Sequence, residues 1–412
     1  MSHAPVRALG PIVLTLERID HATAFEALRE EWNELLAASA ADGLFLTWEW
    51  LSHWWRHLSA GQRLALTLVR AGRQLVAIAP LVVRRRRIAG ILPVRSLELL
   101  GTGSVGSDYL DVIVRRGHER AVRAALAQRF TTDGVMLDLA QLHRDASVAG
   151  DLARDLDARG WVRAETVGQV CPFIDLRGHS WASYLAGLGK EHRYNVQRRL
   201  RNAGRAFDLR FEPARSEDER RTALGLLLRL HDLRFGERSD AFHTPALRAF
   251  HEDLSRAALA RGWLRLFVLS LDGQPAAALY AFAYRRRFYF YQSGFDPAFA
   301  KWSVGLLAMG LAIKHAIEEG AEEYDLLHGD EGYKFHWATQ SRALTRLELY
   351  PPTVRDRFRR QVREASRSGR RLARRLLPEP VADRITVARR LGVRRLWMPR
   401  PVTESTVARC EL

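Results

Sequence analysis

The hydrophobic pattern between residues 288 and 337 predicts a strand, a buried helix, a second strand and an acidic loop. The aromatic run 288–291 has the composition of a strand, and the turn residues after it end that strand near Gln292. Ser303 is expected to cap a helix that is apolar on nearly every side and that Gly320 ends, so this helix should be buried. The polar turn before the helix is a usual place for a phosphate to meet free backbone N–H groups.

The rest of the pattern predicts strands and helices that alternate along two halves of the chain. In the first half we expect strands at 12–16, 64–69, 75–83, 109–114 and 134–139, and helices at 24–38, 119–130 and 147–159. In the second half we expect strands at 171–176, 264–271, 275–284 and 324–327, and helices from Ser180, at 190–204, at 217–235 and at 245–261. This order is compatible with a mixed α/β layer, with a boundary between the halves near residues 161–170.

The length of 412 residues indicates two domains with additional segments. No uncharged apolar run of about 18 residues occurs, and the N-terminus lacks a basic start followed by a sustained apolar core. We therefore expect neither a membrane span nor a signal peptide, and we expect a cytoplasmic protein. Cys171 and Cys410 are the only cysteines, which gives no disulfide framework and no metal-ligand spacing, so no metal is expected.

The net charge of +17 is concentrated in the C-terminal tail. Residues 351–412 contain 17 Arg and no Lys against 6 acidic residues, a net charge of +11, whereas the body is only modestly basic. Spaced apolar residues in this tail also fit a helix that lies on an anionic membrane surface. Only four of the 64 basic residues are lysines, at 190, 301, 314 and 334, and they can mark positions that need a compact amine instead of a guanidinium fork.

Two motifs in the first half admit a structural and a functional interpretation. The tryptophan-rich segment 45–55 either packs in the core or lines a groove, and we favour packing. The run Gly101-Thr102-Gly103-Ser104-Val105-Gly106 matches G-x-G-x-x-G, but a strand-like segment follows it where a dinucleotide site needs a helix. We interpret this run as a loop before Asp108 and Tyr109, which are either groove residues or simple turn residues.

The second half contains a basic stripe on its predicted helix 190–204. Lys190, Arg193, Gln197 and Arg201 follow one another at steps of three and four residues, so they share one face of that helix. Such a stripe is either solvated or binds an anionic substrate or a cofactor phosphate. His231, near the end of the next helix, is interpreted as a hydrogen-bonded structural residue more readily than as a base.

Three motifs follow one another between residues 291 and 337. They are Tyr291-x-Ser293-Gly294-Phe295-Asp296-Pro297, then Ser303-Val304-Gly305-Leu306-Leu307, then Tyr324-Asp325 with Gly329-Asp330-Glu331-x-Tyr333-Lys334-x-x-Trp337. In this order and spacing they resemble the GNAT-superfamily acyltransferases of the cellulose-biosynthesis-associated (Acetyltransf_6) group, which are related to the peptidoglycan-bridge aminoacyltransferases. Weaker similarity runs from about Leu44 to about Tyr350. Two positions depart from the family pattern: His328 stands where Gly or Arg is common, and Gly332 where Pro or Ala is common.

The resemblance implies a mixed α+β sheet with two GNAT-like domains in tandem, at 1–165 and 166–350, followed by a basic, partly helical tail at 351–412. It implies an N-acyltransferase that moves an acyl group from acyl-CoA to the amine of a small molecule or glycan, with the acyl-CoA site in the second domain. By family association this activity belongs to cell-surface polysaccharide or cellulose production in bacteria.

The second half offers groups for each task of acyl transfer from a thioester. The reaction needs alignment of donor and acceptor, an unprotonated amine, and stabilisation of the oxyanion and the departing thiolate. Backbone N–H groups around Ser303, Val304 and Gly305 are expected to hold the pyrophosphate, with Lys301 adding positive charge. The residues expected to bind substrate, in part by the resemblance, are Lys190, Arg193, His231, Arg234, Tyr291 and Ser293.

The loop 329–334 brings two carboxylates, a phenol and an amine within six residues. Asp330 or Glu331 is the expected base, Tyr333 the proton donor to the thiolate, and Lys334 the cation for an acidic acceptor or the oxyanion. The structural alternative is a loop held together by an ion pair between Asp330 and Lys334, which at a surface is worth about 0–1 kcal/mol.

Two other functions remain as alternatives. One is an aminoacyl-tRNA-dependent ligase of the peptidoglycan-bridge type, although the sequence contains no inserted helical hairpin for tRNA and its tail has few aromatic residues for base stacking. Nucleic acid is therefore not an expected partner. The other alternative is a non-catalytic scaffold at the membrane surface, held there by the tail, which would place the protein peripherally on the inner membrane.

Overall fold

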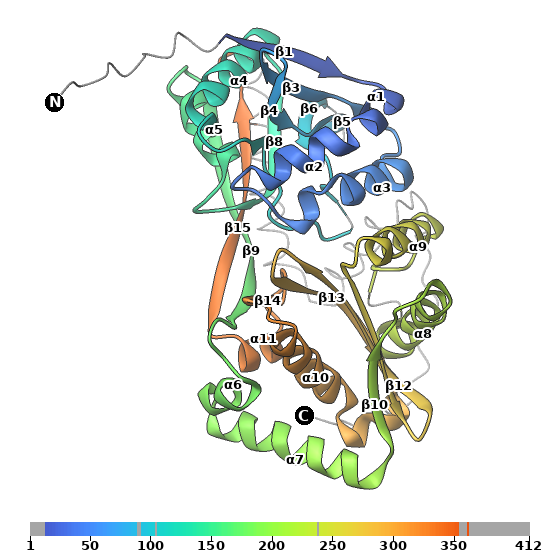
Figure 1. Cartoon of the computed structure of the whole chain (residues 1–412). Coiled ribbons are helices and arrows are strands. Elements are labelled where there is room, and N and C mark those ends of the chain that lie inside the picture. Colours follow the sequence, from blue (N-terminus) through green and yellow to red (C-terminus); the bar gives the residue numbers. More distant parts are fainter. Residues whose placement is uncertain (1–12, 89–91, 104, 237–238, 354–360, 362–412) are drawn as a thin grey trace, which may run out of the picture. The chain divides into compact units, whose positions relative to one another are not determined.

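Two long antiparallel strands, β9 (Val162–Asp175) and β15 (Gln340–Tyr350), connect the two halves of the chain (Figure 1). The computed structural model describes residues 13–88, 92–103, 105–236, 239–353 and 361. Residues 1–86 and 93–356 form one compact unit, to which the description below applies. The predicted tail at 351–412 lies almost entirely outside the described residues.

The helices and strands of this unit alternate along much of the chain. The other strands are β1 (Leu14–Ile19), β2 (Arg63–Leu64), β3 (Leu66–Ala71), β4 (Gln74–Ala79), β5 (Leu81–Ile88), β6 (Leu92–Leu99), β7 (Ile113–Val114), β8 (Met136–His143), β10 (Leu209–Pro213), β11 (Leu264–Leu271), β12 (Gln274–Tyr284), β13 (Arg287–Phe295) and β14 (Glu323–Asp325). The α-helices are α1 (Ala22–Ala27), α2 (Arg29–Ala37), α3 (Trp48–Leu58), α4 (Glu119–Asp133), α5 (Val148–Asp157), α6 (Trp181–Gly187), α7 (Lys190–Ala206), α8 (Glu217–Phe235), α9 (Pro245–Ala260), α10 (Val304–Glu318) and α11 (Gly332–Trp337). Two 3₁₀ turns, η1 (Leu44–Leu46) and η3 (Pro297–Trp302), precede α3 and α10.

Most strands belong to one mixed sheet. Its order is β10-β11-β12-β13-β14-β9-β15-β8-β6-β5-β2, and a smaller sheet has the order β1-β3-β4-β7. Strand β15, from the end of the described body, lies between β9 and β8 and pairs antiparallel with both. The expected mixed α/β class is thereby confirmed, and the sheet runs without interruption from the second half into the first.

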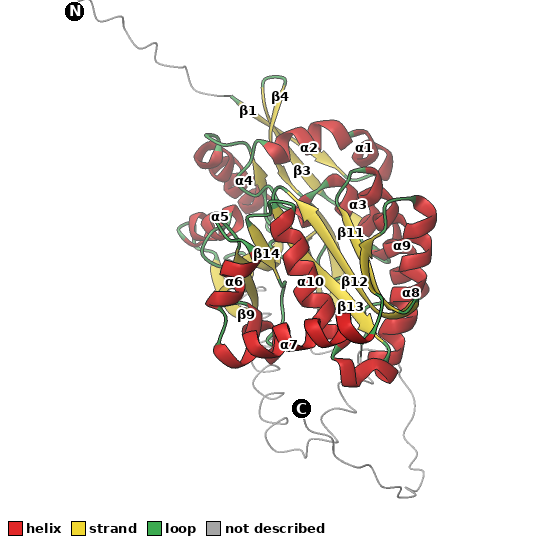
Figure 2. Cartoon of the chain, turned by 60° about the horizontal axis from the view of Figure 1, so that its bottom comes forward, coloured by secondary structure: helices red, strands yellow, loops and turns green. Residues whose placement is uncertain are grey.

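Side chains of β12 alternate between two layers of helices. Tyr280 and Phe282 join the core that contains α8 and α9, whereas Leu279 and Ala281 join the core that contains α10. Figure 2 shows these helices over the sheet. The helix α10 is buried along most of its length, as its all-round apolar pattern predicts.

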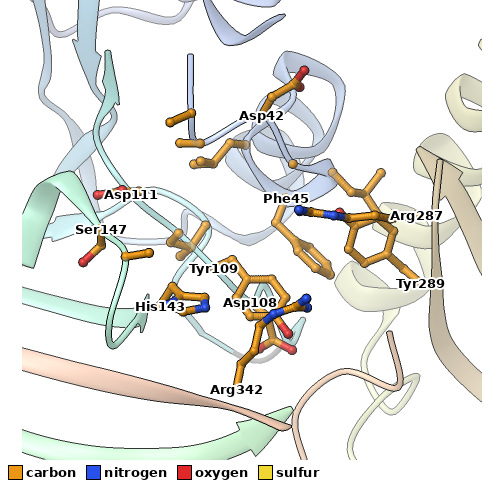
Figure 3. Close-up of a pocket in the computed structure, with 17 residues that line it drawn as sticks. Asp42, Phe45, Asp108, Tyr109, Asp111, His143, Ser147, Arg287, Tyr289 and Arg342 are labelled. Carbon is orange, nitrogen blue, oxygen red and sulfur yellow. The ribbon is translucent and has the colours of Figure 1, made fainter. Parts of the chain in front are cut away.

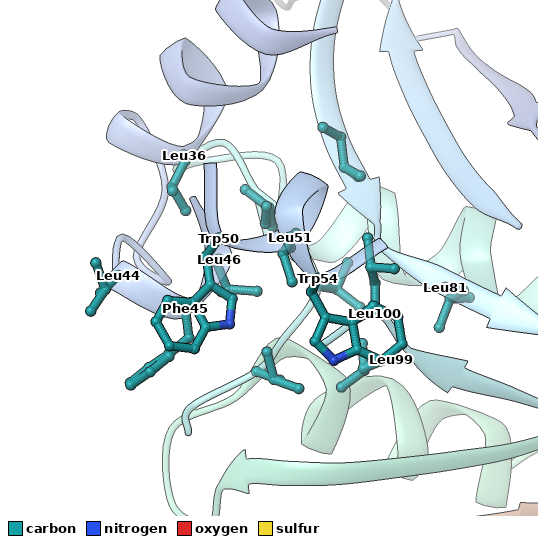
Figure 4. Packing of buried hydrophobic residues seen from close by; sticks show 14 of the residues in the cluster. Leu36, Leu44, Phe45, Leu46, Trp50, Leu51, Trp54, Leu81, Leu99 and Leu100 are labelled. Atoms are coloured by element: carbon teal, nitrogen blue, oxygen red, sulfur yellow. The ribbon is translucent and has the colours of Figure 1, made fainter. Parts of the chain in front are cut away.

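The tryptophan-rich helix α3 is a packing element. Trp50 and Trp54 are buried among leucines of α2, η1 and the segment 99–100 (Figure 4). The indole of Trp50 donates to the Ser107 hydroxyl at 2.9 Å, which satisfies its N–H inside the core. The packing interpretation of this segment therefore holds, and no indole of this pair lines a groove.

Several local predictions are wrong. Strand β13 continues to Phe295 instead of ending near Gln292, because Gly294 and Phe295 still pair with β12. Ser303 precedes α10 in a left-handed conformation, and its side chain makes no capping hydrogen bond, since η3 intervenes and is itself capped by Asp296. Of the strand expected at 109–114, only Ile113–Val114 forms. Tyr109 breaks this strand with a φ of 56°.

Other predictions are incomplete. Strands β6, β10 and β15 are not among the predicted strands, although β10 alternates apolar and charged residues, and β9 begins well before residue 171. This strand spans the predicted domain boundary at residue 165, which stays a prediction.

No helix of the described residues is long and apolar enough to cross a membrane.

The close contact between β13 and α8 gives a stability prediction. A Cβ atom at Gly294 would lie 2.3 Å from the backbone nitrogen of His231, whereas a Cβ at Gly225, in the exposed middle of α8, would meet nothing within 4 Å. We expect Gly294→Ala to lower the free energy of unfolding by about 3 kcal/mol through overpacking. The matched change Gly225→Ala should raise it by about 0.5–1 kcal/mol. Urea denaturation of both variants checks this, and equal stabilities would contradict the packing described.

Candidate active site

The central cavity of the second half opens where β13 and β14 separate. These parallel strands pair only at Arg287 with Glu323, Phe288 with Tyr324, and Tyr289 with Asp325. Beyond these positions, residues 290–293 and 326–330 line a cavity of about 600 Å³. Val105 and Gly106 of the first half complete its wall.

A β-bulge marks the point at which β13 enters this cavity. Tyr280 of β12 pairs with Gln292 and Ala281 with Phe290, so Tyr291 is the extra residue. Its phenol donates to the backbone carbonyl of Val105 and thereby ties the first half to β13. A bulge leaves the extra residue unpaired and locally disrupts the ladder of hydrogen bonds.

The cavity gathers about half of the predicted site residues. Those that line it are Arg234, Tyr291, Ser293, Asp330, Glu331, Tyr333 and Lys334. Those that do not line it are Lys190, Arg193, His231, Lys301, Ser303, Val304 and Gly305. The predicted catalytic loop is therefore a wall of a real cavity, although its second half, from Gly332, is the helix α11.

Lys334 is buried and holds this wall together. Its ammonium group donates to the carbonyls of His328 at 2.8 Å and Leu327 at 3.3 Å, and it pairs with Glu331 at 3.0 Å. The partner is thus Glu331 and not Asp330, which is exposed. Burial opposes the charge of Glu331, but Lys334 outweighs this effect and lowers the pKa of Glu331. Burial raises the pKa of Tyr333 to about 12, so its phenol keeps its proton at neutral pH.

The predicted substrate-binding residues divide into two groups. Arg234 donates to the Ser293 hydroxyl at 3.2 Å and lies over the rings of Phe235 and Phe295, which puts its positive charge beside the cavity. His231 is buried, bonds Ser239, and has its pKa lowered to about 4 mainly by burial. A neutral, enclosed imidazole of this kind fits the structural interpretation of His231.

Helix α7 approaches α10 through a residue other than the predicted ones. Arg193 donates to the Ala186 carbonyl, and Lys190 is exposed. Arg199, from the same helix, donates to the Lys301 carbonyl at 2.7 Å, next to the start of α10. Lys301 itself lies over the ring of Trp302, and its exposed side chain adds charge at this helix start.

His328 and Asp108 form a pair that no local pattern predicts. Nδ1 of His328 lies 2.8 Å from Oδ1 of Asp108, and the backbone N–H of His328 donates to Oδ2 at 2.9 Å. Asp108 is fully buried, and Gln141 and the Cys171 thiol donate to it as well. His328 lines the cavity, and its side chain is 30% exposed. The only sign of His328 in the sequence was its departure from the family pattern.

Asp108 sets the proton affinity of His328. Burial works against a charged imidazole, but the hydrogen bond to Asp108 and its negative charge outweigh burial and raise the pKa of His328 above its ordinary value. Lys334 lowers this pKa and Glu331 raises it, both by smaller amounts. The result is an imidazole at the wall of the cavity that holds its proton more tightly than an ordinary histidine does.

Asp108 also borders a second cavity of about 210 Å³ on its other side (Figure 3). Arg287 and Arg342 line this cavity together with Tyr109 and His143. Arg287 lies 3.7 Å from Glu323, and Arg342 pairs with both Glu323 and Asp325. Asp108 and Tyr109 are thus cavity residues, but Tyr109 lines only the smaller cavity and does not reach the one between β13 and β14.

The Asp108–His328 pair gives a titration prediction. Since the folded-state pKa of His328 is raised, the pair adds stability that is fully present below the unfolded value of about 6.5 and is lost as pH rises through the folded value. Asp108→Asn should lower the pKa of His328, because burial then acts without the opposing charge. A ¹H–¹³C NMR titration of the His328 ring, assigned with His328→Gln, measures this shift. Asp145→Asn, at an exposed site near His143, is the control, and an unchanged titration in Asp108→Asn would refute the coupling.

Comparisons with known proteins support one family. Residues 190–335 match the family model Acetyltransf_6, described as an acetyltransferase (GNAT) domain, and no curated protein matches the chain. The structure of FemX is similar at 13% identity and a TM-score of 0.54, over 77% of this chain and 95% of FemX. The C-terminal domain of a putative lysylphosphatidylglycerol synthetase from Agrobacterium fabrum is similar at 12% identity and a TM-score of 0.51, over 81% of this chain and 93% of that one.

A conserved protein of unknown function from Bacteroides thetaiotaomicron is similar at 10% identity and a TM-score of 0.50, over 82% of this chain and 100% of that one. At these identities the likeness shows a shared fold. Each match extends over more than three quarters of this chain, so the shared fold includes both halves. Within it, the sequence match identifies residues 190–335 as an acetyltransferase domain of the GNAT superfamily, in the Acetyltransf_6 family.

Proposed function

We propose that this protein is an N-acyltransferase that moves an acyl group from acyl-CoA to the amine of an anionic acceptor in the cavity between β13 and β14. The observation that carries the proposal is the Asp108–His328 pair, which brings a proton acceptor to the wall of a cavity whose other wall is a bulged strand. A base and backbone donors on opposite sides of one cavity are what aminolysis of a thioester requires.

Acyl-CoA, the donor, fits along the path from this cavity to the start of α10. A pantetheine arm is slender, and the two separating strands can pair with it through their unused backbone groups. Strand β13 leads through η3 to the start of α10, where the N–H groups of Val304 and Gly305 point out of the helix and favour a pyrophosphate. A Cβ at Gly305 would lie 3.4 Å from the ring of Phe295, so glycine keeps this helix start uncrowded. Lys301 adds positive charge there.

His328 is the base in this mechanism. Asp108 holds the Nδ1 side of the ring, which leaves the Nε2 lone pair for the acceptor amine, as an aspartate orients a histidine in a catalytic triad. The neutral amine attacks the thioester carbon, its proton passes to Nε2, and the C–S bond breaks to release the thiolate. Of the two loop carboxylates, Glu331 is committed to Lys334 and has a lowered pKa, so Asp330 is the competing assignment for the base.

The remaining residues stabilise the negative charges of the oxyanion, the thiolate and the acceptor's acidic group. Backbone N–H groups beside the Tyr291 bulge stabilise the oxyanion, and the fixed ammonium of Lys334 adds a positive potential from the opposite wall of the cavity. Tyr333, with a pKa of about 12, donates a hydrogen bond to the thiolate but holds its proton too tightly to give it up. Arg234, oriented by Ser293, binds an acidic group of the acceptor.

The acceptor in this proposal is a small molecule or glycan that carries both an amine and an acidic group. The family resemblance favours cell-surface polysaccharide or cellulose production as its setting. An association of the tail with an anionic membrane surface, peripheral to the inner membrane, belongs to the same proposal and concerns residues outside those that the structure describes.

One observation favours the alternative donor, an aminoacyl-tRNA. The outer face of α7 exposes Lys190, Arg201 and Arg205, and Tyr194 on this face is 56% exposed with Arg198 over its ring. Cations with a stacking aromatic residue suit an RNA backbone and a splayed base.

Calorimetry separates the two donors. We expect acetyl-CoA or a longer acyl-CoA to bind with one-to-one stoichiometry. Lys301→Ala should weaken this binding about two- to fivefold by removing charge from the helix start. Lys314→Ala is the matched control, because Lys314 lies at the other end of α10 and pairs with Glu318. No acyl-CoA binding, together with binding of aminoacyl-tRNA, would replace the proposal by the ligase.

Turnover tests the base. His328→Gln should lower kcat by about 10²- to 10⁴-fold with acyl-CoA binding retained, since it removes the proton acceptor and leaves the donor site intact. The value of kcat/KM should rise with pH as His328 loses its proton, and Asp108→Asn should move this inflection to lower pH. Asp330→Asn is the comparison: if it abolishes turnover while His328→Gln does not, the carboxylate is the base.

A further inference from the structure

Helices α3 and α9, one from each half of the chain, pack against each other with a polar stripe between them. Glu49 of α3 accepts from Arg261, just after α9, at 2.9 Å, and His57 of α3 lies 2.8 Å from Asp253 of α9. From the first contact to the second, the residue number rises along α3 and falls along α9, so the two helices are antiparallel. Glu49 and His57 are eight residues apart, with His53 midway between them on the same face.

His53 belongs to this stripe but takes part in neither of the two ion pairs. Its Nδ1 atom is buried and has no hydrogen-bond partner among the described residues. The register set by the two contacts puts Ala257, which has no polar side-chain atom, opposite His53. A buried ring nitrogen without a partner costs free energy, so its presence beside His57 and Asp253 calls for a ligand.

We propose that His53, His57 and Asp253 bind a divalent transition-metal ion, for which Zn²⁺ is the best match. One donor atom from each of the three residues lies within 4.8 Å of the others. Donor atoms of two ligands on one tetrahedral Zn²⁺ are about 3.3–3.5 Å apart, so closure around the ion needs only small side-chain movements. Two imidazoles with one carboxylate favour Zn²⁺ over Mg²⁺ or Ca²⁺, which prefer oxygen ligands. Water fills the fourth position.

The surroundings of Asp253 fit the role of a ligand. Arg256 donates to Oδ1 at 3.2 Å, and His57 contacts Oδ2, so the two oxygens already have separate partners. A carboxylate ligand is usually held in this way through its second oxygen. Arg56 lies 3.8 Å from Oδ2, but its side chain is 53% exposed and can turn into solvent when the ion binds. Asp253 and His57 are 26% and 17% exposed, which leaves the ion a path from solvent.

The bound ion would connect the two halves of the chain through α3 and α9, next to the proposed acyl-transfer cavity. Helix α3 carries Trp50, which bonds Ser107 next to Asp108, and α9 carries His251, whose ring lies 5.4 Å from that of Tyr291. The ion therefore stabilises the folded arrangement without touching substrate, independently of which donor the cavity accepts.

Metal titration of the full-length protein, freed of any histidine tag and stripped with EDTA, tests the site. Calorimetry with Zn²⁺ should give one equivalent bound, and Co²⁺ should give the strong visible absorption of a four-coordinate ion with nitrogen ligands. The melting temperature should rise with free Zn²⁺ because the ion binds only the folded state. A wild-type protein that binds no Zn²⁺ and shows no such Co²⁺ absorption would overturn the proposal.

Three variants locate the bound ion. His53→Ala, His57→Ala and Asp253→Asn should each weaken Zn²⁺ binding at least tenfold and remove the Zn²⁺-dependent rise in melting temperature. His315→Ala is the control, because His315 is paired with Glu319 on α10, away from this stripe. Melting in EDTA shows whether each variant folds. If the variants fold and bind Zn²⁺ like the wild type, the ion sits elsewhere and the assignment is wrong.

Discussion

A buried carboxylate organises the centre of this protein. Asp108 is fully enclosed, and an enclosed charge is tolerable only when donors surround it. Those donors come from the segment after β14, from β8 and from β9, so satisfying one side chain of the first half fixes the position of three parts of the chain. The first half therefore supplies the group that orients a histidine of the second half and raises its pKa.

Segments with a strong local apolar pattern and clear turn residues could be predicted from the sequence. Helices α8 and α10 follow from apolar spacing and turn residues, and the match at 291–337 indicates the site region, where Arg234, Ser293 and the loop 329–334 do meet in one cavity. The start of α10 at Val304 was predicted, but the side-chain cap at Ser303 was not formed, because the 3₁₀ turn that Asp296 caps precedes it and leaves Ser303 in a left-handed conformation.

The remaining errors concern contacts between distant positions. His328 and Asp108 are 220 residues apart, and no spacing rule connects them. Strands β9 and β15 owe their length to pairing with each other and not to alternation. His53 and His57 have helical spacing, but their carboxylate partner comes from a helix almost 200 residues later, and cysteine counts alone give no sign of it.

Lys334 is a case in which composition did help. Its three donors serve two carbonyls and Glu331 in a buried space, which suits an ammonium group and not a planar guanidinium.

The place of β15 between β9 and β8 has a consequence for how the chain reaches its folded state. Strand β8 is made early, near residue 140, but its neighbour β15 is synthesised about 200 residues later. Until then the edges of β8 and β9 that β15 will cover remain open to other strands. The sheet of the first half thus cannot be completed during its own synthesis, and the two halves, although each resembles a domain, must finish folding together.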